Sequence, residues 1–398
     1  MAVDPADNAL ARDGSGDDGG ETTLEVLRAL IDAVDRDVLT LLARRMALVA
    51  EVADHKRRHA IPIRDLDRER RLLEDRAQRG RDLGLKTDFI GSVYRLFMKA
   101  SRERQAALRA GLPTDVEPKT VAVIGGEGGM GQSLRRLFSE LGHAVMSTDL
   151  RTRLRPEAAA SRADVVIVSV PIAKTLDVIR AIGPLVREDA LLMDVTSIKE
   201  APLQAMLDVS PASVIGTHPM YGPCVHSFAG QHFVLCRGRG EAWHTWLRSQ
   251  LLARGFRVTE AEAAEHDRAM AIVQVLNHFE TQVMGLALAR SGVAHGESLT
   301  YTSPAYLLES YVTARHFAQD PALYGPIEME NPRTEEVTGH FIDAARELQG
   351  VLLSRDQGRF DALFDEVRAF FGHAFTDESL QQSRFLVDRL VELSAGRE

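Results

Sequence analysis

Cysteine is scarce in this chain, and the scarcity excludes two kinds of structure. Only Cys224 and Cys236 occur among 398 residues. Two cysteines support neither a disulfide framework nor a cysteine-rich zinc site, so both are expected to be small, reduced side chains. The sequence also lacks any apolar run close to the roughly 18 residues that a membrane-spanning helix needs.

Positive charge is not in excess either. The formal net charge of −9 argues against non-specific binding to nucleic acid. Residues 1–21 are polar, acidic and glycine-rich, and they lack the basic and apolar segments of a signal peptide, so a disordered tail is predicted. We therefore expect a cytoplasmic enzyme that neither enters a membrane nor binds nucleic acid.

Helical periodicity dominates residues 22–109. The apolar spacing predicts a long helix from 22 to about 59, a charged helix over 65–80 stopped by Gly80, and a third helix over 87–109. Three helices are few for an independent core, so this unit is expected to be dimeric.

Strands and helices alternate in the middle of the chain, after a linker over 110–118. This pattern predicts a parallel sheet in a Rossmann-type domain over 119–257. Beyond the strand that begins at 121, the expected strands are 143–149, 164–171, 190–197, 213–219 and 232–236. From 258 to 398 an all-helical domain is expected, with helices over 260–290, 304–318, 333–354 and 357–393. The segment 270–289 is apolar almost all round, which predicts burial in a core or between subunits, and hence a dimer through this domain too.

The sequence VAVIGGEGGMG at 121–131 organises the sheet domain. Its residues Gly126-Glu127-Gly128-Gly129-Met130-Gly131 have the G-x-G-x-x-G spacing between a strand and a helix. Gly126 is expected to form the tight turn, Gly128 to admit a pyrophosphate, and Gly131 to let the helix pack on the sheet. The alternative is a glycine-rich turn in some other α/β sheet.

The next strand ends in Asp149, 23 residues past Gly126, where a carboxylate binds a ribose 2′-hydroxyl and favours NAD. Arg151 and Arg153 leave NADP open. The expected cofactor-binding residues are Gly126, Gly128, Met130, Gly131, Asp149 and, at the end of the following strand, Ser169 and Pro171.

Two further strands end in polar residues, Asp194 to Lys199 and His218 to Pro223. Ligands of doubly wound sheets bind at the carboxyl ends of the strands. A histidine there, His218, could take the proton of a substrate hydroxyl. The alternative is that His218 is an ordinary member of a set of 13 histidines.

Polar residues also share helix faces in the first unit. Arg45 and Lys56 are 11 residues apart, about three turns, so they frame an apolar floor that suits a small dianion. Arg28 points elsewhere and would have to come from a partner subunit. Ser101 and Gln105 share a face of the third helix. The alternative is that all of these are ordinary solvated side chains.

The segments LRALIDAVDRDVLTLLARRMALVAEVADHK, PIRDLDRERRLLE and SRERQ resemble the all-helical chorismate mutase family over residues 24–108. The resemblance implies rearrangement of chorismate to prephenate at a site formed by Arg28 of a partner subunit, Arg45, Lys56, Asp65, Arg68, Glu69, Ser101 and Gln105. Arg28 and Arg45 would bind the carboxylates of the substrate. Lys56 and Gln105 would face its ether oxygen, and the two acidic residues would hold its hydroxyl.

The motif HPMYGP at 218–223, with EHDRAMAIVQVLNHF and RHFAQDPALY, resembles the prephenate dehydrogenase family over roughly 119–375. The resemblance implies oxidative decarboxylation of prephenate to 4-hydroxyphenylpyruvate with NAD⁺. His218 would act on the ring 4-hydroxyl with help from Ser197. Arg315 would bind a carboxylate, and His266 and His278 would line the cleft.

The expected architecture is therefore an all-α chorismate mutase domain, an α/β Rossmann-type dinucleotide-binding domain and an all-α C-terminal dimerisation domain. This order resembles the bifunctional T-protein family of tyrosine biosynthesis, which implies a homodimer and inhibition by tyrosine. Three alternatives stay open: a preference for L-arogenate or NADP⁺, a mutase unit that serves mainly as a dimeriser, and a non-catalytic sensor of aromatic amino acids. A sensor would be expected to have lost residues such as Arg45 and His218.

Overall fold

The computed structural model describes residues 23–59, 65–110, 117–225 and 227–395. The chain divides into two units, residues 1–108 and 109–398, each with its own fold. The predicted disorder of 1–21 and most of the predicted linker lie outside the described residues.

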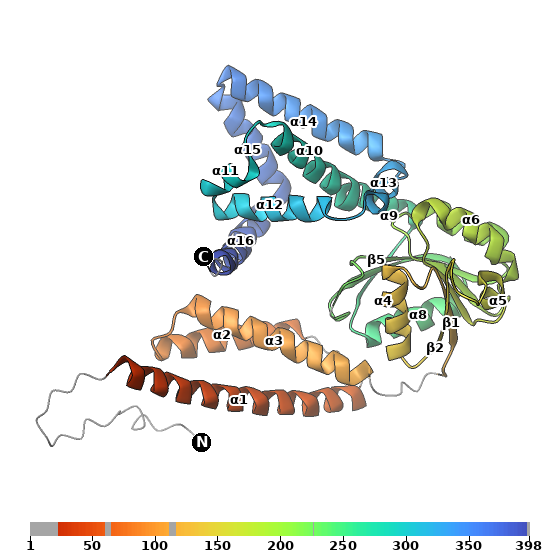
Figure 1. Ribbon diagram of the computed structural model, residues 1–398, viewed down its shortest axis with the longest axis horizontal. Helices are drawn as coiled ribbons and strands as arrows, with labels where there is room; N and C mark the ends of the chain where they lie inside the picture. The colour runs from red at the N-terminus through yellow and green to blue at the C-terminus, as the bar shows by residue number, and fades with distance from the viewer. Residues whose placement is uncertain (1–22, 60–64, 111–116, 226, 396–398) are drawn as a thin grey trace, which may run out of the picture. The chain divides into compact units, whose positions relative to one another are not determined.

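The first unit contains the three predicted helices, α1 (Leu24–Arg58), α2 (Leu66–Asp82) and α3 (Thr87–Ala110) (Figure 1). The prediction that Gly80 ends the second helix is wrong, because α2 continues to Asp82 and the left-handed turn belongs to Gly84, with φ of 75°. Gly80 has a packing role instead. A Cβ there would lie 2.7 Å from Cγ1 of Ile90, so the missing side chain lets α2 and α3 approach closely.

The apolar stripe of α1 is buried only near its C-terminal end. Val49 and Ala53 are buried, whereas Ile31 and Val34 are each 60% exposed. An apolar stripe of this length is stable in water only if another surface covers it. The first unit therefore presents a face that suits a partner.

The second unit is built on a seven-stranded sheet in the order β2-β1-β3-β4-β5-β6-β7. Its strands are β1 (Thr120–Ile124), β2 (Ala144–Thr148), β3 (Val165–Val168), β4 (Leu191–Asp194), β5 (Ser213–Pro219), β6 (His232–Arg239) and β7 (Arg257–Ala261). The first five strands run parallel, β6 is antiparallel to β5, and β7 is parallel to β6. Because β1, β3 and β4 are buried on both faces, they read as continuous apolar runs in the sequence.

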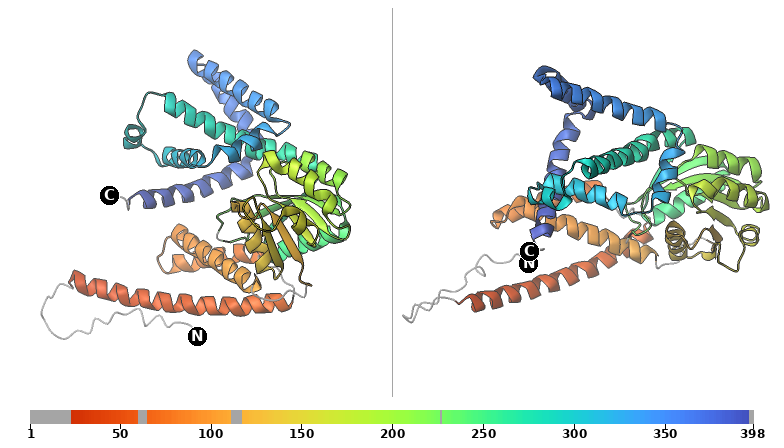
Figure 2. Two further views of the ribbon diagram at one scale, coloured as in Figure 1. Left: turned by 45° about the vertical axis from the view of Figure 1, so that its right-hand side comes forward. Right: turned by 45° about the horizontal axis from the view of Figure 1, so that its top comes forward.

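Helices cover both faces of the sheet (Figures 1 and 2). On one face, α4 (Gly129–Glu140) and α8 (Glu241–Ala253) bury Leu134, Leu137, Leu247 and Leu251. On the other face lie α5 (Pro156–Ala160), α6 (Ile172–Ile182) and α7 (Glu200–Val209). The layers confirm the doubly wound architecture expected from the alternation of strands and helices.

The strand β7 (Arg257–Ala261) was not among the expected strands, and it crosses the expected domain boundary after residue 257. Only Val258 and Ala261 of this strand are partly buried, and the others are exposed. An edge strand with so weak an apolar alternation carries little sequence signal.

Helices make up the rest of the second unit. They are α9 (Ala263–Met270), a π-helical segment (Ala271–Leu276), α10 (Asn277–Arg290), α11 (His295–Thr300), α12 (Pro304–Phe317), α13 (Pro321–Met329), α14 (Thr334–Ser354), α15 (Gln357–Phe371) and α16 (His373–Ala395). The short helices α11 and α13 were not predicted. The predicted helix over 357–393 is two helices, separated at Gly372, where φ is 75°.

These helices bury little apolar surface among themselves. Their core cluster consists of Ala271, Val275 and Val337, whereas Ile272 and Val273 in the π-helical segment are 55% and 52% exposed. The core of the single chain therefore buries only part of the predicted apolar segment. Across the described part of the chain, no helix is long and apolar enough to cross a membrane.

Candidate active sites

The strand order reverses direction between β1 and β3, and the loops after these two strands therefore define the ligand-binding edge of the sheet. The loop after β1 is held by Gly125, whose φ is 84° and whose Cβ, if present, would lie 2.3 Å from the carbonyl oxygen of Ser169. We expected Gly126 to form this turn, but its backbone is not left-handed. Gly126 lacks a side chain for another reason, since a Cβ would lie 2.4 Å from Oγ of Ser147.

The other two fingerprint glycines differ in what surrounds them. A Cβ on Gly131 would lie 2.2 Å from the carbonyl oxygen of Gly125, so close packing of α4 requires this glycine. At Gly128 the nearest atom would be 3.4 Å away, so no protein atom requires a glycine there. Gly128 is also the N-cap of α4 and provides no side-chain cap. An uncapped helix N-terminus next to open space fits a pyrophosphate, as in NAD.

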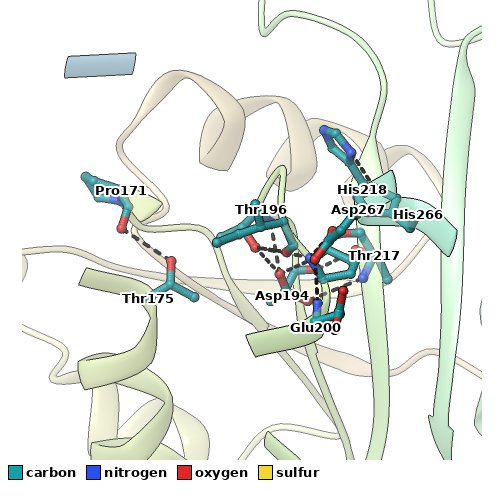
Figure 3. Close-up of polar contacts among 11 residues, drawn as sticks. Pro171, Thr175, Asp194, Thr196, Glu200, Thr217, His218, His266 and Asp267 are labelled. Carbon is teal, nitrogen blue, oxygen red and sulfur yellow. Dashed lines mark hydrogen bonds and ion pairs between the residues drawn. The ribbon is translucent and has the colours of Figure 1, made fainter. Parts of the chain in front are cut away.

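The carboxylate of Asp149 lies beside this loop. One oxygen accepts a hydrogen bond from the amide of Leu150 at 2.7 Å, and the other accepts from the amide of Glu127 at 3.3 Å. Pro171 is the N-cap of α6 and accepts from the hydroxyl of Thr175 at 3.3 Å (Figure 3). The residues predicted after β1, β2 and β3 thus lie together at the carboxyl ends of these three parallel strands.

His218 is the first member of a chain of three buried side chains (Figure 3). Its Nδ1 is 2.9 Å from Nε2 of His266, and Nδ1 of His266 is 2.8 Å from Oδ1 of Asp267. His218 comes from the end of β5 and the other two from α9. The structure therefore brings together His218 and His266, as predicted, and adds Asp267.

Asp267 is held in its ionised form. Burial raises the pKa of this carboxyl, but hydrogen bonds from His266 and from the amides of Glu200 and Lys199 outweigh burial and leave the pKa below its usual value. Those amides lie 2.9 and 2.7 Å from the carboxylate oxygens. A carboxylate only accepts, so Nδ1 of His266 donates to it.

The hydrogen bond from His266 to Asp267 determines which nitrogen of each imidazole carries a proton. With both rings neutral, Nε2 of His266 is an acceptor, and Nδ1 of His218 must be the donor. The remaining nitrogen of His218, Nε2, then carries a lone pair. Burial is the largest cause, followed by electrostatic interactions with His266 and Lys199, and together they hold the pKa of His218 well below its ordinary value. His218 is therefore a neutral base at physiological pH.

A buried ion pair supports the strand end that carries His218. Lys199 and Asp194 are fully buried and in contact, and Nζ of Lys199 also donates to the carbonyl oxygen of Thr217 at 2.7 Å. The hydroxyl and amide of Thr217 donate in turn to the carbonyl and carboxylate of Asp194. Thr196 adds its amide, 3.0 Å from the same carboxylate. Sequence reasoning placed Asp194 and Lys199 at a strand end but did not find this pairing.

The other predicted dehydrogenase residues lie in different surroundings. Ser197 is half-buried in the turn after β4. Arg315 is exposed on α12. His278 lies 12 residues beyond His266, or about 18 Å along a helix. Its contacts are Glu328, 3.6 Å from its Nδ1, and the rings of Tyr324 and His316. The described contacts do not bring these residues to His218.

In the first unit, Arg45 is fixed from α3. Its Nη1 lies 2.7 Å from the hydroxyl of Ser101 and 3.3 Å from the carbonyl oxygen of Phe97. Gln105 is buried on the same helix and donates to the carbonyl oxygen of Ser101 at 3.2 Å. The structure thus brings together three predicted residues, Arg45, Ser101 and Gln105, and Lys56 is half-buried on α1.

The predicted acidic residues of this unit differ from each other. Glu69 pairs with Arg102, whose Nη1 is 2.6 Å from Oε1. Arg102 was not predicted, since only its position next to Ser101 marks it in the sequence. Asp65 caps α2 by accepting from the amide of Arg68 at 2.9 Å, and both residues are exposed. Arg28 is exposed on α1.

Comparison with known proteins covers both units. Residues 27–106 match the family model of chorismate mutase type II. Residues 143–259 match the nucleotide-binding domain of prephenate dehydrogenase, and residues 262–366 match its dimerization domain.

Relatives with both units are similar along nearly the whole chain. The T-protein of Enterobacter agglomerans is 37% identical over 368 residues, covering 92% of this chain and 95% of that protein. The T-protein of Haemophilus influenzae is 34% identical over 375 residues, covering 94% and 98%. A crystal structure of prephenate dehydrogenase from A. aeolicus, in complex with hydroxyphenyl propionate and NAD+, has a TM-score of 0.53 at 16% identity, covers 64% of this chain and 98% of its own, and thus shares the fold.

The fold and the histidine chain define an NAD-dependent dehydrogenase of the prephenate dehydrogenase class, joined to a chorismate mutase. The chain belongs to the T-protein family, the bifunctional enzymes of tyrosine biosynthesis that make prephenate and then oxidise it. The expected family, fold class and two enzyme activities are confirmed. Neither a preference for arogenate nor a sensor function finds support in these matches.

The partly buried His278 makes stability depend on pH. Burial, with His316 second, lowers its pKa to about 4. The unfolded chain, with a pKa near 6.5, binds this proton first, so the folded state loses stability as pH falls from about 6.5 to about 4. At ~1.4 kcal/mol per pKa unit, the loss is roughly 3 kcal/mol.

We expect His278→Asn to lose less stability than the wild type between pH 7 and pH 4.5, in urea unfolding of the full chain. The matched control is His340→Asn, because His340 is exposed on α14. Equal losses in the wild type and His278→Asn would contradict the buried, neutral state of His278.

Proposed function

We propose that Nε2 of His218 is the general base of the dehydrogenase reaction. The observation that carries this proposal is the chain from Asp267 through His266 to Nδ1 of His218, with distances of 2.8 and 2.9 Å. This chain fixes the ring and leaves the lone pair on the opposite nitrogen. In that role Nε2 accepts the proton of the ring 4-hydroxyl of prephenate while hydride leaves C4.

Bound NAD⁺ supplies the acceptor for that hydride, and loss of the ring carboxylate as CO₂ makes the ring aromatic. The glycine loop and the uncapped N-terminus of α4 would hold its pyrophosphate, and Asp149 would bind the ribose hydroxyls. Met130, Ser169 and Pro171 would line the same edge of the sheet. Ser197 would assist at the substrate hydroxyl, while Arg315, His266 and His278 would complete the substrate cleft.

His218→Asn tests the base directly. We expect the turnover of prephenate to fall by about 10²–10⁴-fold, because a general base contributes on that order. NAD⁺ affinity and loss of chorismate should not change, since His218 belongs to neither of those sites. The measurement is NADH absorbance with prephenate as substrate. Near wild-type turnover in His218→Asn would contradict the assignment of His218 as the general base.

For the mutase, we propose a pocket in which Arg45 and Lys56 bind the substrate dianion. The contact of Arg45 with Ser101 and Phe97 supports this, because it holds the guanidinium in one orientation before substrate binds. Lys56 and Gln105 would stabilise negative charge on the ether oxygen in the transition state.

The acidic side of the pocket would be formed by Glu69, with Asp65 and Arg68 at the start of α2. The pairing of Glu69 with Arg102 supports a fixed carboxylate there, 2.6 Å from the guanidinium. Such a carboxylate could accept a hydrogen bond from the substrate hydroxyl while remaining neutralised. No covalent step is required, so the pocket acts by positioning and by electrostatics.

We further propose that the enzyme is a homodimer and that Arg28 of the partner subunit completes each mutase pocket. The exposed stripe of α1 around Arg28 and the exposed apolar residues of the π-helical segment support two separate dimer contacts. Tyrosine is a proposed inhibitor, because it carries the ring and a carboxylate that the dehydrogenase cleft accepts. A cytoplasmic location is proposed from the free thiols of Cys224 and Cys236.

Mixing two inactive variants tests the shared pocket. Arg28→Ala and Arg45→Ala should each lose mutase activity. Co-refolding them in equal amounts should restore about one quarter of wild-type activity, because half of the dimers are mixed and each mixed dimer has one complete pocket. Chorismate absorbance is the readout. No recovery, with mixed dimers verified by mass, would mean that Arg28 acts within its own chain or not at all.

A further inference from the structure

The residue between the first two fingerprint glycines, Glu127, is tied to the loop and to β2. Its Oε1 accepts from Nη1 of Arg135 at 2.7 Å and from the hydroxyl of Ser147 at 2.6 Å. Its amide donates to Asp149 at 3.3 Å. Ser147 lies near the end of β2 and Asp149 directly follows the strand. The ribose of a dinucleotide lies at this strand end in doubly wound folds. Glu127 is thus a second carboxylate at the ribose end.

Arg135 is the arginine of α4 that reaches this carboxylate (α4 and β2, Figure 1). Its Nη1 also donates to the carbonyl oxygen of Gly126 at 3.2 Å. The side chains of Glu127 and Arg135 are 50% and 37% exposed, so both remain within reach of a ligand from solvent. In NADP-binding domains of this type, an arginine near this position accommodates the 2′-phosphate. Here the guanidinium of Arg135 already pairs with the carboxylate of Glu127.

We propose that Glu127 is a determinant of cofactor specificity, acting against NADP⁺ in two ways. Its charge repels a 2′-phosphate, which carries about −1.5 to −2 at neutral pH. It also holds Arg135 in an ion pair, so that the guanidinium does not bind that phosphate. The inference rests on the proposed placement of the ribose at Asp149.

The role is separate from that of Asp149. Asp149 accepts hydrogen bonds from two backbone amides, so its position is set by the loop and by β2. Glu127 is held by side chains, and its removal leaves those amide contacts in place. A change at Glu127 should therefore alter NADP⁺ binding much more than NAD⁺ binding.

The test is equilibrium binding of NAD⁺ and NADP⁺ to the full-length protein by titration calorimetry. In Glu127→Gln we expect the Kd for NADP⁺ to fall about tenfold and the Kd for NAD⁺ to change by less than about threefold, because an exposed charge contributes modestly. The gain should weaken as KCl is raised, since it is ionic. The double variant Glu127→Gln with Arg135→Gln should lose most of the gain and keep only the part that comes from the lost repulsion.

Two controls make the outcome specific. Glu188→Gln removes the same charge from an exposed residue just before β4. This residue lies at the amino ends of the parallel strands, opposite the cofactor, so both affinities should be unchanged. An unchanged NADP⁺ affinity in Glu127→Gln would overturn the proposal. So would a gain that survives removal of Arg135 in full, because the released guanidinium would then contribute nothing to NADP⁺ binding.

Asp149→Asn separates failure of this inference from failure of the cofactor placement. If the ribose lies at the end of β2, this variant binds NAD⁺ more weakly. An unchanged NAD⁺ affinity would overturn the placement and the role of Glu127 together. Weaker NAD⁺ binding in Asp149→Asn, with no effect of Glu127→Gln, would overturn the role of Glu127 alone.

Discussion

The contact on which the dehydrogenase site depends is the buried ion pair between Lys199 and Asp194. Two fully buried charges are costly unless hydrogen bonds satisfy them, and here Thr196, Thr217 and the ion pair itself do so. Because Thr217 precedes His218, the same bonds fix the end of β5. The amide of Lys199 also binds Asp267 on α9. One short segment after β4 therefore positions both ends of the histidine chain.

The histidine chain follows from that frame. Two amides at the start of α7 anchor the carboxylate of Asp267. Because Nδ1 of His266 donates to this carboxylate, only Nε2 of His266 is left to bind His218. Asn331 donates to the carbonyl oxygen of Asp267 at 3.0 Å and so joins α9 to the segment before α14. Burial then keeps His218 neutral. Position and desolvation therefore make His218 a base, and its ring is held by the hydrogen bond at Nδ1.

Local patterns in the sequence predicted much of this. The apolar run of β1 and the glycines after it predicted the binding edge of the sheet, and His218 was identified from its place at a strand end. Residues whose roles arise from distant contacts were not found. Asp267 binds amides that lie 68 and 67 residues away in the sequence. Arg102 on α3 pairs with Glu69 on α2. Gly125 was missed because the fingerprint spacing with Gly128 and Gly131 selects Gly126, one residue later. β7 was missed because an exposed edge strand carries a weak apolar pattern.

The central claim is that His218 is neutral, with its proton on Nδ1 and its lone pair on Nε2. Nitrogen-15 NMR of protein labelled at histidine measures this directly, with the His218 signals assigned by their loss in His218→Asn. We expect a protonated-type signal for Nδ1 and an unprotonated-type signal for Nε2 at neutral pH. A proton on Nε2, or a doubly protonated ring, would contradict it.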